Sequence, residues 1–139
     1  METKNNINIA ATSKSPGVTL DTELNIFEIQ GNSRPENVRD FYYPLIDKLK
    51  KYFEDLLAKN KMKATKDLPL EFKFKLTYFN SSSAKFILDI LVLIKEYEDL
   101  GFNIKIYWHY DEDDEDMHVV GQDFSDMIDF PFIFIMVQF

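Results

Sequence analysis

One stretch of this sequence constrains the fold more than any other. Residues 70–79, LEFKFKLTYF, place an apolar side chain at every second position. Strict alternation of this kind predicts a β-strand with one buried face. Residues 82–99 then carry apolar side chains around most of a helical circumference, which predicts a largely buried helix. A strand that leads directly into such a helix indicates an α/β fold, with helices packed on a sheet.

The rest of the sequence predicts the element order β-β-α-β-α-β-α-β. This order implies a mixed sheet with parallel core strands and helices packed on it. Residues 1–17 are predicted to be a polar leader with a short strand at Ile7 and Ile9. Ser33 and Glu36 have the spacing of a capping box, which predicts a helix start. Pro44 predicts a kink or a break in that helix. The other expected elements are strands at 18–21, 25–30, 103–110 and 132–137, helices to about 59 and after the acidic run 111–116, and a helix stop at Gly101.

Composition narrows the class of protein. A chain of 139 residues suits one domain, so residues 1–139 are expected to form it. The absence of cysteine excludes disulfides and thiolate chemistry and favours the cytoplasm. A net charge of −8 repels phosphate backbones, so we expect no nucleic-acid partner. Neither a signal peptide nor an apolar run of spanning length is present, so no membrane insertion is expected.

Most catalytic signatures are missing. The four glycines are too few and too scattered for a P-loop or a dinucleotide fingerprint, and we expect no cofactor. His109 could meet one of Ser81–Ser83 in space, but no Gly-x-Ser-x-Gly elbow exposes a nucleophile. The acidic run 111–116 fails the EF-hand pattern. It is interpreted as a helix start, a looser Mg²⁺ or Ca²⁺ site, or an acidic docking surface.

Three serines, Ser81–Ser83, lie between the predicted strand and the buried helix. Ser81 or Ser82 is the expected N-cap, whose loss costs about 1 kcal/mol. One cap needs only one hydroxyl. A strand-to-helix junction in a parallel arrangement also lies at the carboxyl edge of the sheet, where ligands and partners meet such folds. Phosphate on a hydroxyl there would add about −1.5 to −2 charges at the positive end of a helix, which the fold tolerates.

Five stretches of the sequence match the pattern of a known family: TSKSPGVTLD (12–21), GNSRPENVRDFYYPL (31–45), YFNSSSAKFILDIL (78–91), WHYDEDDEDM (108–117) and PFIFI (131–135). The segments with Tyr-Phe-Asn-Ser-Ser-Ser and Asp-Asp-Glu-Asp-Met are the most specific. Together the five stretches span nearly the whole chain. On these residues the sequence resembles the SiaC family of bacterial regulatory phosphoproteins.

The resemblance implies a fold similar to the anti-sigma-factor antagonists (STAS-like) and a partner-switching role. It implies a dedicated kinase, a PP2C-type phosphatase, and an unphosphorylated form that activates a diguanylate cyclase in cyclic-di-GMP signalling and biofilm regulation. Carried over by position, the phosphate acceptor is Ser81, where family members often have threonine. Ser82 and Ser83 are the alternative acceptors.

The leading hypothesis is therefore a non-enzymatic switch protein. Its expected docking surface comprises Asn80, Ser81, Ser82, Ser83 and Lys85. The alternative is a small hydrolase or a Mg²⁺- or Ca²⁺-dependent enzyme that uses Ser81, His109 and the acids of 111–116. A third hypothesis is an interaction module without covalent control. Part of the aromatic cluster Phe41–Tyr43 is a further candidate contact patch.

Overall fold

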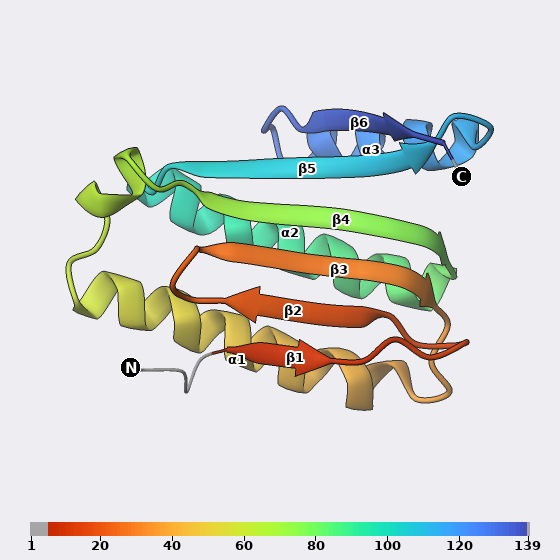
Figure 1. The fold of residues 1–139 in the computed structure, drawn as a ribbon, viewed down its shortest axis with the longest axis horizontal. Helices are drawn as coiled ribbons and strands as arrows, with labels where there is room; N and C mark the ends of the chain where they lie inside the picture. Colours follow the sequence, from red (N-terminus) through yellow and green to blue (C-terminus); the bar gives the residue numbers. More distant parts are fainter. Residues whose placement is uncertain (1–5, 139) are drawn as a thin grey trace.

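The structure is a computed structural model that describes residues 6–138 (Figure 1). The first five residues of the predicted polar leader, and Phe139, lie outside the described part. The described chain forms one six-stranded sheet with three α-helices. The α/β class and the mixed sheet predicted from the sequence are confirmed. None of the described helices is long and apolar enough to cross a membrane.

The strands lie in the sheet in the order of the chain, so each strand pairs with its sequence neighbours. The first two pairs are antiparallel, and the three pairs from β3 to β6 are parallel. The predicted short strand forms as β1 and adds one strand to the expected order. The strands are β1 (Ile7–Ile9), β2 (Gly17–Asp21), β3 (Ile26–Ser33), β4 (Leu70–Phe79), β5 (Ile104–Asp111) and β6 (Ile133–Val137).

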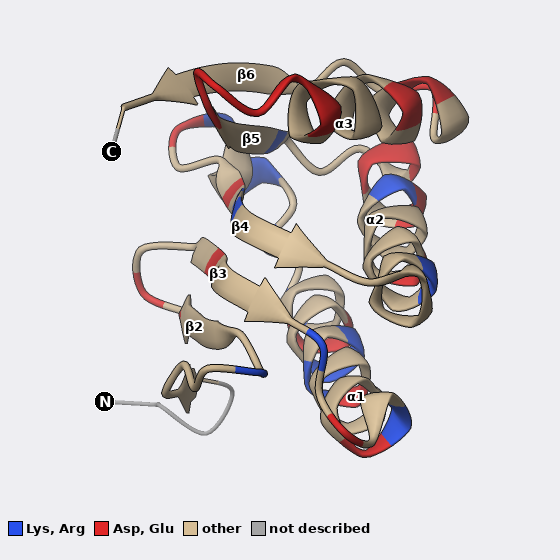
Figure 2. Cartoon of the chain, turned by 90° about the vertical axis from the view of Figure 1, so that its right-hand side faces the viewer, with Lys and Arg blue, Asp and Glu red and all other residues tan. Residues whose placement is uncertain are grey.

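The three helices, α1 (Val38–Ala58), α2 (Ser81–Leu100) and α3 (Glu115–Met127), all cover the same face of the sheet (Figure 2). Three successive parallel crossovers that advance in one direction place their helices on one face, because such connections are right-handed. A short 3-10 turn, Lys63–Lys66, lies between α1 and β4. None of the described helices covers the opposite face of the sheet, which carries ion pairs such as Lys75–Glu28, 2.9 Å apart.

The core lies between the sheet and the helices. The alternation in β4 holds: its four apolar residues from Leu70 to Leu76 are buried against the helices. Trp108 of β5 is buried, and its indole Nε1 donates to the carbonyl of Met117 at 3.0 Å. Gly121 of α3 lies directly against this ring, since a Cβ there would be 2.5 Å from the indole. A side chain at position 121 would therefore force α3 away from β5.

The expected start of the first helix is wrong. Ser33 does not open a capping box with Glu36, because β3 continues through Ser33, which pairs with Phe79 of β4. The helix begins at Val38 instead, where the Asn37 side chain accepts a hydrogen bond from the amide of Asp40 at 3.1 Å.

Two other local predictions for the helices have different outcomes. Pro44 was expected to kink or break the first helix, and α1 continues through it, so the break did not form. Gly101 ends α2 in the left-handed conformation, with φ of 118°, as predicted.

Candidate functional site

The junction between β4 and α2 is capped by Asn80, not by a serine. The Asn80 side-chain oxygen accepts a hydrogen bond from the Ser83 amide at 2.9 Å. The Asn80 amide donates to the Ser33 carbonyl at 3.2 Å, which fixes the junction to the end of β3. Helix α2 therefore begins at Ser81, and the expected cap at Ser81 or Ser82 is wrong by one or two residues. Asparagine and serine are about equally good caps, so neither hydroxyl is needed for this purpose.

The three serines have different environments. Ser81 and Ser82 are exposed, whereas Ser83 is 0% exposed. The Ser83 hydroxyl donates to the Ser33 carbonyl at 3.0 Å and accepts from the Ser33 hydroxyl at 2.8 Å. The Tyr42 hydroxyl lies 2.5 Å from the Ser33 hydroxyl. Because the Ser33 proton is already used, Tyr42 donates to Ser33.

This network joins β3, α1 and α2 below the exposed serines. Burial raises the pKa of Tyr42, while the neighbouring hydroxyls of Ser33 and Ser83 act in the opposite direction. The phenol is therefore a neutral donor. Ser83 is inaccessible to a kinase or a partner in the folded protein, so the structure removes it from the candidate acceptors and from the expected docking surface.

The exposed start of α2 has backbone amides that could bind a negatively charged group. Within residues 6–138, no hydrogen bond to protein is present for the amides of Ser81 and Ser82. The first turn contains no acidic residue. Such an end carries the positive partial charge of the helix dipole. Lys85, one turn after Ser81, is exposed and its Nζ lies 5.7 Å from the centre of the Phe86 ring.

An exposed aromatic ring borders this helix start. Tyr43 of α1 is 54% exposed, and its ring meets that of Phe86 edge to face at 5.5 Å. Tyr42, by contrast, is buried and stacks on the same Phe86 ring. The predicted contact patch at 41–43 therefore reduces mainly to Tyr43. Aromatic rings are common anchors in protein interfaces. We name Asn80, Ser81, Ser82, Lys85 and Tyr43 the α2 docking surface.

His109 does not meet the serines. Partial burial and the positive charge of Lys75 lower its pKa. The side chain lies on the face of the sheet opposite the helices, among charged side chains of β3 and β4. The serines lie at the start of a helix on the other face. No hydrogen bond joins His109 to Ser81–Ser83 in the described chain. The triad form of the hydrolase hypothesis therefore lacks its geometry.

The second half of the acidic run 111–116 forms the start of α3, whereas Asp111 ends β5 and residues 112–113 lie in the turn between the two elements. The Asp114 side chain caps this helix by accepting from the Met117 amide at 3.0 Å. Glu115 and Asp116 occupy its first turn, where the helix dipole favours negative charge. No group of three or more carboxylate or histidine side chains is arranged to hold a metal ion among residues 6–138. The helix-start interpretation accounts for Asp114, Glu115 and Asp116, while the Asp111 side chain accepts from the Asp113 amide in the preceding turn.

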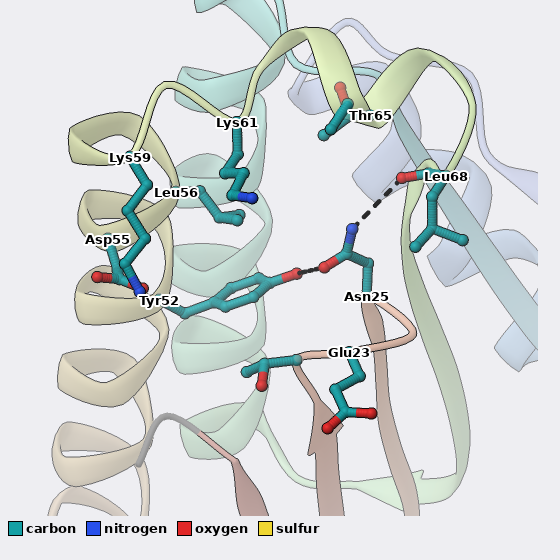
Figure 3. Close-up of a pocket in the computed structure, with 11 residues that line it drawn as sticks. Glu23, Asn25, Tyr52, Asp55, Leu56, Lys59, Lys61, Thr65 and Leu68 are labelled. Atoms are coloured by element: carbon teal, nitrogen blue, oxygen red, sulfur yellow. Dashed lines mark hydrogen bonds and ion pairs between the residues drawn. The ribbon is translucent and has the colours of Figure 1, made fainter. Parts of the chain in front are cut away.

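Two cavities lie at opposite ends of the sheet. One, of about 520 Å³, is bordered by the end of α1 and the connector after it, where the Tyr52 hydroxyl donates to Asn25 at 3.0 Å (Figure 3). The other, of about 570 Å³, lies where β4 and β5 separate beyond the Phe74–Trp108 pair and is lined in part by Lys75 and His109. Neither is lined by the exposed serines.

Comparison with known proteins identifies the relatives of this chain. The family model for the SiaC family regulatory phosphoproteins matches residues 9–137. An uncharacterized protein of Pseudomonas aeruginosa strain UCBPP-PA14 is 29% identical, over 91% of this chain and 92% of its own length.

Solved structures show the same similarity. SiaC of P. aeruginosa, in a crystal structure of the diguanylate cyclase SiaD in complex with its activator SiaC, matches with a TM-score of 0.81 and 28% identity, over 94% of this chain and 99% of that one. A structure of apo-SiaC matches with a TM-score of 0.75 and 28% identity, over 96% and 98%. Because the family model covers most of the sequence, the chain belongs to the SiaC family of regulatory phosphoproteins.

Proposed function

We propose that this protein is a non-enzymatic, cytoplasmic switch that forms one domain over residues 1–139 and binds a diguanylate cyclase when it is unphosphorylated. The partner class comes from the similar SiaC of P. aeruginosa, which is an activator of the cyclase SiaD. A dedicated kinase phosphorylates Ser81, with Ser82 as the alternative acceptor, and a PP2C-type phosphatase removes the phosphate. The exposed hydroxyl of Ser81 on an anchored, uncharged helix start is the observation that supports this function best.

The two states of the switch differ in charge at the α2 docking surface. A phosphate on Ser81 adds about −1.5 to −2 charges, next to Ser82 and one turn from Lys85. A partner that packs on Tyr43 and reaches Lys85 would then have to remove water from the phosphate, and desolvating a charged group is costly. The affinity for the cyclase falls as a result.

The fold is expected to remain unchanged in both states. The cap at Asn80 and the hydroxyl of Ser83 hold α2 in place without using the Ser81 side chain. The amides of Ser81 and Ser82 are available to the phosphate, and the helix dipole stabilises a negative charge there. Phosphorylation therefore acts on binding rather than on folding.

The decisive experiment first captures a diguanylate cyclase from a lysate of the source cell on the Ser81→Ala protein. It then compares the affinity of this cyclase for wild type, Ser81→Ala and Ser81→Asp. We expect Ser81→Ala to bind like the unmodified wild type. Ser81→Asp should bind at least about tenfold more weakly, the loss expected from about 1.4 kcal/mol. Production of cyclic di-GMP by the cyclase gives a second readout. Equal binding by all three proteins would show that Ser81 is not the switch.

Matched variants at Ser82 separate the two candidate acceptors. Ser82→Ala and Ser82→Asp have the same chemistry one position later on the same exposed turn. If only Ser82→Asp weakens binding, the acceptor is Ser82. Intact mass of the protein from its native cell, before and after phosphatase treatment, should show the loss of one phosphoryl group. An unchanged mass would favour an interaction module without covalent control.

A further inference from the structure

The sheet has one edge that is open to pairing. Strand β6 pairs with β5, and no described strand lies on its other side (Figure 1). Its five residues, IFIMV, contain no charge and no proline. Natural sheets usually protect an edge with short strands, charges, prolines or bulges, because its free amides and carbonyls can pair with another chain. The opposite edge strand, β1, has only three residues.

The side chains of β6 provide apolar contacts on both faces of this edge. Ile133 is 40% exposed and Met136 is 61% exposed. Because they are three positions apart in a strand, they lie on opposite faces of the sheet. A strand added next to β6 would place its own side chains beside both of them, at the distances at which cross-strand pairs stabilise a sheet.

The sequence that contains β6 is strongly one-sided in charge. Residues 106–139 contain nine of the 24 acidic residues and none of the 16 basic ones, so the rest of the chain is nearly neutral. The acidic segment before α3 runs close to β6 (Figure 2). Glu112 is held at the end of β6, since its amide donates to the Val137 carbonyl and its carboxylate accepts from Gln138. Exposed Asp129 lies shortly before the strand begins.

This charge distinguishes between possible occupants. A second copy of the chain would bring two acidic segments together, which is unfavourable at an interface. A basic segment would meet complementary charge at both ends of the strand. We propose that the β6 edge binds an extended, basic segment of another protein, which joins the sheet as a seventh strand. The apolar strand gives the affinity, and the acids select the partner by charge.

This surface is separate from the α2 docking surface. In the sheet order, β6 is two strands away from β4, whose end leads into α2. Binding at β6 therefore does not depend on the state of Ser81. Ser81→Asp should bind the probe peptide described below as wild type does, so failure of the switch hypothesis and failure of this proposal are distinguishable.

The test uses a synthetic peptide of about ten residues, the length of a long strand. Its central residues alternate between valine and threonine, and each end carries two lysines. Titration calorimetry should show binding that weakens as salt rises, because the charges are exposed. A peptide with glutamates in place of the lysines should bind at least about tenfold more weakly, as like charges oppose it. Amide hydrogen exchange should slow in β6 and not in β1.

Two variants of the protein complete the test. Met136→Lys puts a charge on the exposed edge and should weaken binding of the basic peptide at least about tenfold. Asn8→Lys makes the same change on the opposite edge strand and should leave binding unchanged. Slower amide exchange in β6 of the wild-type protein tests the proposal without any variant. The test therefore still stands if Met136→Lys folds poorly. No binding at millimolar peptide, equal binding of the acidic peptide, unchanged exchange in β6, or self-association of the chain through β6 would overturn the proposal.

Discussion

Two helices of this protein begin in the same way and differ in charge. Both α2 and α3 follow a parallel strand at the carboxyl edge of the sheet. Each is capped by a side-chain oxygen that accepts from the amide three residues later, Asn80 from Ser83 at 2.9 Å and Asp114 from Met117 at 3.0 Å. The first turn of α3 contains two acids, whereas that of α2 contains none.

In both helices the third residue anchors the helix to the sheet. Ser83 does so through its hydroxyl, which bonds to Ser33. Met117 does so through its carbonyl, which accepts from the Trp108 indole. The starts of both helices are therefore fixed to the sheet. The two starts differ in the source of negative charge. In α3 it comes from acidic side chains, whereas in α2 the phosphorylation proposal requires that a phosphate supply it.

The largest expected effect concerns the packing that holds α3. Gly121→Val should lower the free energy of unfolding by about 3 kcal/mol, because the new side chain overlaps the Trp108 ring. Gln122→Val, at an exposed neighbouring position, is the matched control and should change it by less than about 0.5 kcal/mol. Urea denaturation measures both. Equal losses would mean that α3 is not held as closely as the structure indicates.

The anchor of α2 should give the next largest effect. Ser83→Ala should lower the free energy of unfolding by about 2 kcal/mol, because the buried Ser33 hydroxyl and carbonyl each lose a hydrogen-bond partner. The same substitution at exposed Ser82 leaves no buried group without a partner and should be close to neutral. Thermal and urea unfolding of the pair measure the difference. A neutral Ser83→Ala would show that the hydroxyl network does not anchor α2.

The two N-caps should contribute similar amounts to the free energy of unfolding. Asn80→Ala and Asp114→Ala each remove an acceptor from a helix start and should each cost about 1 kcal/mol. Chemical denaturation of the two variants gives the comparison directly. A loss at only one of them would contradict the equivalence of the two junctions.

The smallest effect tests the difference in charge itself. Ser81 and Glu115 are the first residues of their helices. Ser81→Asp should stabilise the protein by about 0.5 kcal/mol, and Glu115→Ser should destabilise it by about the same amount. Both changes should shrink in 1 M salt, which screens exposed charges. If Ser81→Asp is instead clearly destabilising, the start of α2 is not suited to carry phosphate.

The sequence predicted the elements whose pattern is local. The alternation in residues 70–79 and the apolar surface of the following helix correspond to β4 and α2 within one residue. The identity of the α2 cap was beyond local reasoning, because asparagine and serine have nearly equal preference there. The exposure of Ser81 and Ser82 next to a junction at the sheet edge agrees with the expectation from the β–α pattern.

What the sequence did not predict depends on contacts between distant residues. Ser33 has the spacing of a capping box, but its pairing with Phe79 extends β3 and overrides that signal. Its hydroxyl then bonds to Ser83, 50 residues later. No pattern within either segment indicates this contact. For the same reason, Ser83 could not be distinguished from its two exposed neighbours before the fold was known.

The sheet order has a consequence for how the protein forms. Because every strand pairs with its sequence neighbours, a chain emerging from the ribosome can add each strand to a partner that has already been made. Domains generally fold as units during synthesis, starting from the N-terminal side. The hydroxyl bond between Ser33 and Ser83 can form as soon as the first turns of α2 leave the exit tunnel, before β5 and β6 are added.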